Sequence, residues 1–261
     1  MSSDQMLFEQ RGPVAWLTLN RPEAMNSINL AMISAYEEYL PKIASDDSIR
    51  VLVITGRGQA FCAGADLKEV LASKALPPGE PTFLDRGLAV FSTLRNLGKP
   101  VIVALNGITM AGGLETAICG DIVLAAEDAR IGDCHANYGV FPGGGGASIL
   151  PRLIPKNVAS YLLFTGKTLT AKQMQEYGFV NQVVPADKLE EAAQKLGELI
   201  ASKSPLALRR MKEVVRTSQD ATRADALRHE YLEMQNQMRS WDFTEGLKAF
   251  SEKRNPEFKG Y

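Results

Sequence analysis

The sequence predicts an α/β fold in which strand–turn–helix units recur, followed by a tail built of helices alone. Short, continuous apolar runs at 50–55 and 101–105 have the length and composition of strands that are buried on both faces. Each run leads through glycines into a segment with helical character, which gives two corresponding units at 51–69 and 101–119. Beyond Pro205 the sequence contains no further strand pattern. Alternation of strands and helices is typical of the α/β class.

The first fifty residues are expected to form a hairpin and a helix. Residues 6–10 and 14–19 have the composition of strands, and Arg11-Gly12-Pro13 between them favours a turn. The second strand ends at Asn20-Arg21-Pro22. A helix is then expected, because apolar residues recur at helical spacing at Leu30, Ile33, Leu40 and Ile43.

The first strand–turn–helix unit continues from its strand through a turn at 56–59. Asp66 is positioned to cap a short helix, and Glu69 three residues later completes a capping-box pattern. The start of that helix leaves unpaired backbone N–H groups near Ala65. This turn therefore presents hydrogen-bond donors just before a helix.

The second unit contains the best candidate for a reaction site. The adjacent glycines Gly112 and Gly113 precede a predicted helix at 114–119, and without a Cβ they let backbone N–H groups approach a ligand. The helix start adds unpaired N–H groups and a partial positive charge, which suits a developing negative charge. Glu115 follows three residues after Gly112, and His135 comes shortly before a run of four glycines. Oxyanion donors beside two titratable side chains indicate an enzyme.

The remaining elements complete the pattern of strands followed by helices. Further strands are expected at 121–126, 131–134 and 180–184. Further helices are expected at 84–97, 147–153, 155–164, 189–200 and 243–253. The proline-rich stretch 76–81 is expected to be a surface loop. An apolar helical stripe from Leu227 to Trp241 fits packing against another subunit or against the chain's own core.

The composition excludes several classes of protein. The chain has 261 residues, of which 45% are hydrophobic and 23% charged, as in an ordinary globular protein. Its 29 basic and 30 acidic residues nearly balance, so a polyanionic partner such as nucleic acid is not expected. The three cysteines lack metal-ligand spacing, which predicts no metal site and a reducing, cytoplasmic environment. No apolar run reaches the roughly 18–20 residues of a membrane span, and the N-terminus lacks a signal-peptide pattern.

Four stretches resemble the enoyl-CoA hydratase/isomerase (crotonase) family, and the resemblance covers nearly the whole chain. They are LNRP at 19–22, FCAGADLKE at 61–69, NGITMAGGLETAICGD at 106–121 and the stretch 131–146. The second and third stretches together are highly specific. Residues 250–254 are also similar to the end signature of that family.

The resemblance implies a crotonase-like spiral of ββα repeats with a C-terminal helical trimerisation region. Residues 1–204 would form the spiral core with the acyl-CoA site, and residues 205–261 the helical oligomerisation region. A homotrimer, or a hexamer built as a dimer of trimers, is implied as the assembly. The substrate would be an acyl-CoA thioester, and no separate cofactor is implied because CoA is part of the substrate.

The resemblance also assigns roles to individual residues. The backbone N–H groups of Ala65 and Gly112 would form an oxyanion hole, which agrees with the donors expected at both turns. Glu115 matches the first catalytic glutamate of the hydratases, which activates or orients the attacking water. The second hydratase glutamate is replaced by His135, a departure from the family pattern. Contacts with the substrate are expected from Ala63, Asp66, Leu67, Lys68, Gly113, Tyr138, Phe141 and Lys253.

Four residues of that set carry specific expectations. Lys68 and Lys253 would meet the phosphates of CoA, Lys253 from a neighbouring subunit, although both also fit plain surface charge. Tyr138 and Phe141 would form the wall of the acyl pocket, or else belong to the ordinary core.

The replacement at His135 leaves the reaction open. In a hydratase, Glu115 would activate water and His135 would donate a proton to the α-carbon, since an imidazole titrates near pH ~6.5. Alternatively, His135 acts as a base that sends water to a carbonyl carbon, or it only orients the substrate. The leading hypothesis is an enoyl-CoA hydratase, and the alternatives are an isomerase, a C–C hydrolase, a decarboxylase or a non-catalytic acyl-CoA-binding member. Cys134 and His135, as neighbours in an extended segment, are expected to point to opposite faces.

Overall fold

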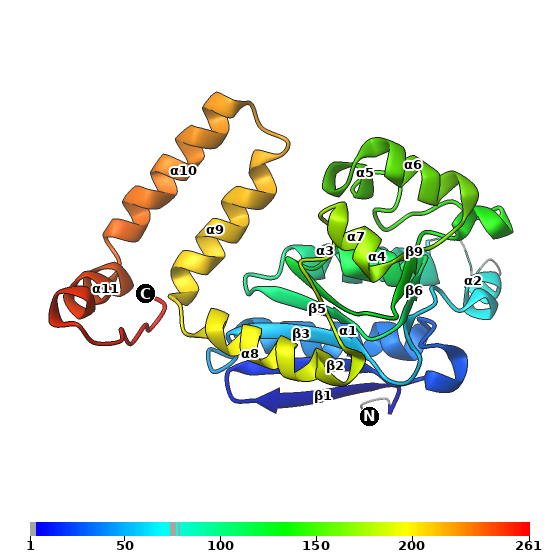
Figure 1. Ribbon diagram of the computed structural model, residues 1–261, viewed down its shortest axis with the longest axis horizontal. Helices are drawn as coiled ribbons and strands as arrows, with labels where there is room; N and C mark the ends of the chain where they lie inside the picture. The colour runs from blue at the N-terminus through cyan, green and yellow to red at the C-terminus, as the bar shows by residue number, and fades with distance from the viewer. Residues whose placement is uncertain (1–3, 74–76, 78) are drawn as a thin grey trace.

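The chain forms two adjoining sheets with helices packed over them (Figure 1). The structure is a computed structural model and describes residues 4–73, 77 and 79–261. The larger sheet consists, in spatial order, of β1 (Met6–Arg11), β2 (Val14–Leu19), β3 (Val51–Gly56), β5 (Val101–Leu105), β7 (Ile122–Ala126) and β10 (Gln182–Val184). The smaller sheet consists of β4 (Ala60–Cys62), β6 (Ile108–Met110), β8 (Arg130–Gly132) and β9 (Leu169–Thr170).

The helices fall into those that cover the sheets and those that follow them. The first set is α1 (Leu30–Ser45), α2 (Leu67–Ser73), α3 (Phe83–Arg95), α4 (Gly112–Ile118), α5 (Leu150–Leu153), α6 (Lys156–Thr165), α7 (Ala171–Glu176) and α8 (Leu189–Ala201). The second set is α9 (Pro205–Ser218), α10 (Arg223–Met238) and α11 (Trp241–Glu252). Short 3₁₀ turns are η1 (Pro22–Ala24), η2 (His135–Tyr138) and η3 (Ala186–Lys188).

The central strands of the larger sheet, β2, β3, β5 and β7, are buried on both faces, which explains their continuous apolar runs. Alternate residues of β3 and β5 belong to two separate hydrophobic clusters. Leu52, Ile54 and Val103 pack into the cluster that includes α1 and α3. Val53 and Ile102 point the other way and pack against α8. Because successive side chains of a strand point to opposite faces, a strand covered on both sides must be apolar throughout.

The chain passes through the two sheets in a repeated ββα pattern. A strand of the larger sheet is followed by a strand of the smaller sheet and then by a helix, as in β3–β4–α2 and β5–β6–α4. The corresponding strands are parallel, with Ile54 opposite Val103 in one sheet and Cys62 opposite Thr109 in the other. Each repeat therefore advances the chain by one strand in both sheets. The predicted α/β spiral of ββα repeats is confirmed.

The tail after α8 consists of helices alone, as expected, but its boundaries differ from the prediction. Figure 1 shows α9 and α10 as an antiparallel pair that extends away from the sheets. The apolar stripe predicted from Leu227 to Trp241 does not lie on one helix, because α10 ends at Met238. Ser240 caps the next helix by accepting the N–H of Phe243 at 3.1 Å. The division into units at 1–204 and 205–261 stays a prediction, although Pro205 does open α9.

Several smaller expectations need correction. The helix predicted at 147–153 begins only at Leu150. Helix α7 was not predicted from the sequence. Strands β4, β6 and β9 contain two or three residues each, which is too short for a pattern of alternation. The predicted loop at 76–81 lies partly outside the described residues. Within the described chain, none of the helices has the length and hydrophobicity needed to cross a bilayer.

Candidate active site

Two turns of the ββα repeats meet at the carboxyl ends of β4 and β6. These strands are parallel neighbours, so the turns that follow them lie side by side. A Cβ built on Gly112 would lie 3.5 Å from the backbone nitrogen of Ala65, which shows how closely the two turns approach. The N–H groups of Ala65 and Gly112 donate to no acceptor in the part of the chain that the structure describes. The structure thus brings together the two donors that the sequence predicted.

The residue before one donor has an unusual backbone conformation. Ala111 has φ 48° and ψ −119°, a combination that costs a residue with a Cβ of order 1–3 kcal/mol. Its N–H donates to the carbonyl oxygen of Gly132 on β8 at 3.2 Å. Its side chain faces the other turn, because a Cβ built on Gly64 would lie only 2.9 Å from the Cβ of Ala111. The surrounding contacts therefore hold Ala111 in a strained conformation that orients the Gly112 N–H.

Glu115 lies in the first turn of α4 and is buried, with only 4% of its surface exposed. Its Oε1 atom accepts the N–H of Gly144 at 2.5 Å and the N–H of Gly146 at 3.3 Å. Burial raises the pKa of Glu115, and the Gly144 hydrogen bond and the charge of His135 offset only part of that effect. A Cβ on Gly144 would lie 2.6 Å from the Phe91 ring, so this position requires glycine.

His135 begins η2 and pairs with a buried carboxylate that the sequence analysis did not single out. Its Nδ1 atom lies 3.0 Å from Oδ1 of Asp133, which is completely buried. Burial opposes protonation of His135, but the hydrogen bond and charge of Asp133, with the charge of Glu115, outweigh it and raise the pKa. The segment is not extended as predicted, because Cys134 has φ 61° and turns the chain into η2.

Arg95 at the end of α3 is a second residue that the sequence analysis missed. Its Nη1 atom donates to the carbonyl oxygen of Gly144 at 2.8 Å. The same guanidinium contacts the Cys119 thiol at 3.5 Å, and that thiol contacts the carbonyl oxygen of Glu115 at 3.1 Å. Helices α3 and α4 therefore hold the glycine run from two sides. No local sequence pattern indicates such a contact between residues 49 positions apart.

Four of the predicted substrate-binding residues lie on the turn beside the Ala65 donor. The Ala63 N–H is taken by the carbonyl oxygen of Met25 at 3.0 Å. Asp66 caps α2 by accepting the Lys68 N–H at 3.1 Å, and its other oxygen accepts both terminal nitrogens of Arg21 at 3.2 Å. The side chains of Leu67 and Lys68 are exposed at the start of α2. Asp66 thus shapes the turn, and the two exposed residues border it.

The other predicted contacts are more dispersed. Gly113 packs on β4, since a Cβ there would lie 2.1 Å from the carbonyl oxygen of Cys62. Tyr138 and Phe141 are 76% and 81% exposed, so they line no enclosed pocket in the isolated chain. Lys253 directly follows α11, which lies far from α2 and α4 (Figure 1). Within one chain, Lys253 does not join the other site residues.

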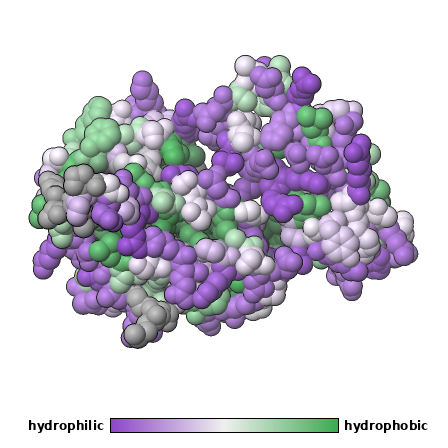
Figure 2. All heavy atoms as spheres, turned by 180° about the vertical axis from the view of Figure 1, so that it is seen from behind, coloured by the Kyte–Doolittle hydropathy of each residue, from purple (hydrophilic) through white to green (hydrophobic). Residues whose placement is uncertain are grey.

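Exposed apolar side chains lie around the site. Figure 2 shows hydrophobic residues gathered on the side of the molecule that carries α2 and α6 in Figure 1. Leu67 and Leu71 of α2 and Leu84 and Leu88 of α3 are among the exposed apolar residues. The described residues contain no group of three or more His, Cys, Asp or Glu side chains arranged to hold a metal ion. Two N–H donors, a buried carboxylate and an imidazole can polarise a carbonyl group and move protons near it.

Comparisons with known proteins agree with this chemistry. A family model described as enoyl-CoA hydratase/isomerase matches residues 9–261. The chain is 38% identical to the 2,3-dehydroadipyl-CoA hydratase of Escherichia coli over 98% of this chain and 99% of that protein. It is 36% identical to a probable enoyl-CoA hydratase of Rhizobium meliloti, with 99% of both chains covered. The crystal structure of an enoyl-CoA hydratase from Bacillus anthracis matches with a TM-score of 0.92 and 35% identity, covering 98% of this chain and 100% of that one.

Proposed function

The chain is an enzyme of the enoyl-CoA hydratase/isomerase family, and we propose that it adds water across the C2=C3 bond of an enoyl thioester of CoA. The observation that carries this proposal is the placement of two N–H groups, at Ala65 and Gly112, near the buried carboxylate of Glu115. Neither N–H group has an acceptor among the described residues. Related proteins that share more than a third of their residues with this chain are named as hydratases.

The first task of the site is to stabilise negative charge on the thioester oxygen. When water attacks C3, the electrons of the double bond move toward the carbonyl group and form an enolate. The N–H groups of Ala65 and Gly112 are oriented before substrate binds, so they stabilise this charge without reorganisation. In other enzymes, removal of one such donor raises the barrier by roughly 2.7–4 kcal/mol.

The second task is to move two protons. Glu115 takes a proton from water as the oxygen bonds to C3, and His135 in its protonated form gives a proton to C2 of the enolate. Both side chains are neutral after this step. Glu115 then loses its proton to solvent and His135 takes one up, which restores the starting protonation states. The raised pKa of His135 favours the protonated form that this step needs. Lys68 at the exposed start of α2 would contact the CoA phosphates, and Tyr138 and Phe141 would contact the acyl group.

The experiment is to follow the loss of enoyl-thioester absorbance with crotonyl-CoA. We expect turnover by the native chain, a loss of roughly 10²–10⁴-fold in Glu115→Gln, and a comparable loss in His135→Ala. His229→Ala is the matched control, because it removes the other histidine, which lies on α10 and contacts Thr217 instead. Full activity in Glu115→Gln would contradict the proposed role. Binding of CoA thioesters without turnover would exclude short-chain hydration and redirect the search to bulkier enoyl-CoA and β-keto substrates.

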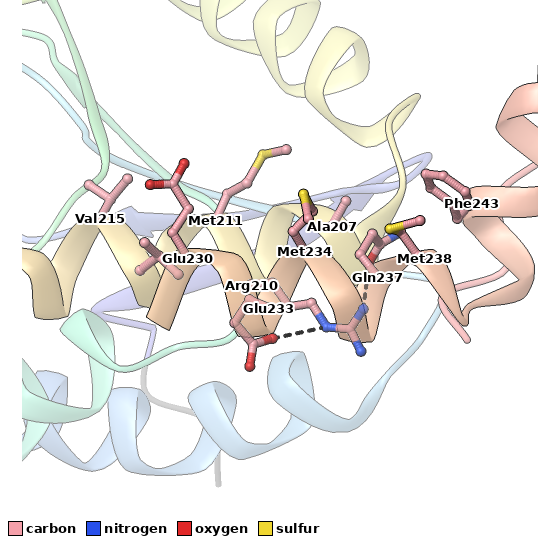
Figure 3. Close-up of a pocket in the computed structure, with 11 residues that line it drawn as sticks. Ala207, Arg210, Met211, Val215, Glu230, Glu233, Met234, Gln237, Met238 and Phe243 are labelled. Carbon is pink, nitrogen blue, oxygen red and sulfur yellow. Dashed lines mark hydrogen bonds and ion pairs between the residues drawn. The ribbon is translucent and has the colours of Figure 1, made fainter. Parts of the chain in front are cut away.

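We further propose that the chain assembles as a homotrimer, alone or paired into a hexamer, through α9–α11. An apolar groove lies between α9 and α10 (Figure 3), where Arg210 forms an ion pair with Glu233 at 3.2 Å. The lining includes Met211, Val215, Met234, Met238 and Phe243. Phe250 on α11 is 85% exposed. A second copy of the chain is the occupant that would bury these side chains and bring its Lys253 toward the site.

Two further expectations follow from the proposed reaction and from the cysteines. Addition of water to an enoyl thioester requires no redox step, so the proposed enzyme uses no cofactor apart from the CoA of its substrate. Cys62, Cys119 and Cys134 are free and buried, which supports a reducing compartment such as the cytoplasm.

A further inference from the structure

We propose that Asp133 is a positioning residue for His135: it holds the imidazole through Nδ1 and leaves Nε2 as the nitrogen that exchanges a proton with substrate. The geometry supports this assignment, and its consequence for catalysis depends on the hydration reaction proposed above. Within the described residues, Nδ1 contacts Asp133 and Nε2 has no hydrogen-bond partner. Nδ1 must carry a proton to donate to a carboxylate oxygen, so the neutral ring has its lone pair on Nε2.

The contacts of Asp133 serve His135 more than they serve the fold. Asp133 is fully buried, and Oδ1 receives both of its hydrogen bonds from His135, one from Nδ1 at 3.0 Å and one from the backbone N–H at 3.3 Å. Oδ2 is buried and has no partner among the described residues. A buried carboxylate with an unpaired oxygen is unfavourable for stability. A carboxylate kept mainly to stabilise the loop would have both oxygens satisfied.

The backbone around Asp133 is shaped to admit its carboxylate. Cys134 adopts a left-handed conformation with φ 61°, and this brings His135 back toward Asp133 two residues earlier. A Cβ on Gly146 would lie 2.5 Å from Oδ2 of Asp133, so any larger residue there would displace the carboxylate. The N–H of Gly146 also contacts Glu115. One glycine therefore borders both carboxylates of the site.

Among the described residues, Asp133 and Glu115 are the charged groups that act on the His135 ring. Asp133 on its own segment and Glu115 on α4 both favour the imidazolium, whereas burial opposes it. The neighbouring Cys134 thiol has a pKa that burial raises, so it stays neutral. Helix α6 packs against η2 through an uncharged contact, in which the Asn137 amide donates to the carbonyl oxygen of Gly166 at 3.0 Å. In the proton transfer, Nε2 gives its proton to C2 while Nδ1–H remains bonded to Asp133, which itself stays ionised.

The test is a pH titration of ¹⁵N-labelled histidine by NMR, which needs no substrate. The chain has only two histidines, so the spectrum of His229→Gln identifies the signals of His135. In the chains that keep His229, its signals serve as an internal control. We expect neutral His135 to carry its proton on Nδ1. In Asp133→Asn, which keeps the size of the side chain, the pKa of His135 should fall by about 1–3 units while His229 is unchanged. An unchanged pKa of His135, or a neutral native ring protonated on Nε2, would overturn the proposal.

A kinetic measurement then separates this proposal from the proposed reaction. For hydration, kcat/KM should rise as Glu115 ionises and fall as His135 loses its proton, which gives a bell-shaped pH profile. In Asp133→Asn the basic limb should move to lower pH by the shift that NMR measures, with kcat reduced roughly 10²-fold or more near neutrality and KM little changed. If NMR shows the shift but no enoyl-CoA is hydrated, the positioning role stands and the proposed reaction fails. A basic limb that does not move in Asp133→Asn would contradict the role in catalysis.

Discussion

Glu115 and His135 lie in environments that suit complementary tasks. Burial raises the pKa of Glu115, so the carboxylate takes up a proton more readily than an exposed one. For His135, burial acts against the charged ring, but Asp133 and Glu115 reverse that effect and raise the pKa. A more basic carboxylate and a more strongly protonated imidazole are what a base and an acid require near neutral pH.

Glu115→Gln should remove activity without loss of stability. The amide oxygen of glutamine still accepts the N–H groups of Gly144 and Gly146, and the uncharged side chain avoids the unfavourable burial of a charge. Folding raises the pKa of Glu115 above its ordinary value of 4.5. Glu115 therefore contributes to the free energy of unfolding below pH 4.5, and this contribution is lost as the pH rises through the pKa of the folded state. The melting temperature of the variant should therefore equal or exceed that of the native chain at pH 7.

The control for this prediction is Glu115→Ala, which leaves both glycine N–H groups without their acceptor. Such a loss typically destabilises a protein by about 1–3 kcal/mol, so its melting temperature should fall. A fall of the same size in Glu115→Gln would show that the charge itself stabilises the fold, against the argument from burial.

Helices α3 and α4 hold the glycine run between them, and this arrangement fixes the carboxylate of Glu115. Arg95 on α3 takes the carbonyl oxygen of Gly144, while Glu115 on α4 takes the N–H of the same residue.

The tail helices depend on a comparable set of contacts. Asp242 of α11 is buried and accepts the hydroxyl of Ser204 at 2.5 Å and the Lys259 N–H at 2.7 Å. The end of the chain is thereby attached to the junction between α8 and α9.

Arg95→Met should lower kcat while leaving the fold intact. Methionine fills much of the same volume but cannot hold the Gly144 carbonyl, so the carboxylate of Glu115 becomes less well placed. We expect kcat to fall roughly 10-fold or more, with KM little changed. Arg86→Met is the matched control on the same helix, because Arg86 pairs with Glu37 at the surface. Equal kinetic effects in both variants would show that α3 as a whole, and not the contact with Gly144, is responsible.

Asp242→Ala should loosen the C-terminal tail. It leaves the backbone N–H groups of Lys259 and Gly260 without their acceptor, and we expect a loss of stability of about 1–3 kcal/mol. Limited proteolysis should then cut the chain after α11 more rapidly. Glu252→Ala on the same helix removes only exposed ion pairs, with Arg254 and Lys248, and should change stability by less than about 0.5 kcal/mol. Comparable proteolysis of both variants would rule out Asp242 as the anchor of the tail.

The sequence predicts the overall architecture better than the details of the site. Both faces of β5 are covered because it lies in the centre of the larger sheet, so Val101–Leu105 is apolar throughout and easily recognised. The donors at Ala65 and Gly112 are predictable because their glycines and helix starts are local features. The contact of Arg95 with Gly144 depends on how two distant elements pack, and no local pattern contains it.

Two local errors also have physical causes. Asp133 was not recognised because no local sequence pattern pairs it with His135. The pairing depends on Cys134, which turns the chain and places Nδ1 of His135 beside the carboxylate. The apolar stripe that reaches Trp241 suggested a single helix, but Ser240 interrupts it by capping a new one. In each case one residue with a specific backbone role changed the outcome.

The exposed groove of the tail predicts the behaviour of the whole molecule in solution. Met234→Glu would place a charge among the apolar side chains of α9 and α10, and a partner subunit could then bury that surface only at high cost in free energy. Sedimentation should give the mass of a trimer or hexamer for the native chain and of smaller species for this variant. Gln235→Glu, the next residue on α10 but outside the groove, should leave the assembly unchanged. A monomeric native chain would contradict the proposed assembly.

The most direct test of the account is the fate of crotonyl-CoA incubated with the native chain in D₂O, followed by NMR and mass spectrometry. Attack of water guided by Glu115 and protonation of C2 from His135 predict a 3-hydroxyacyl thioester with one deuterium on the α-carbon. A product with a shifted double bond and no hydroxyl group would indicate isomerisation and contradict the account. A thioester that exchanges hydrogen for deuterium but never gains the oxygen of water would also contradict the account.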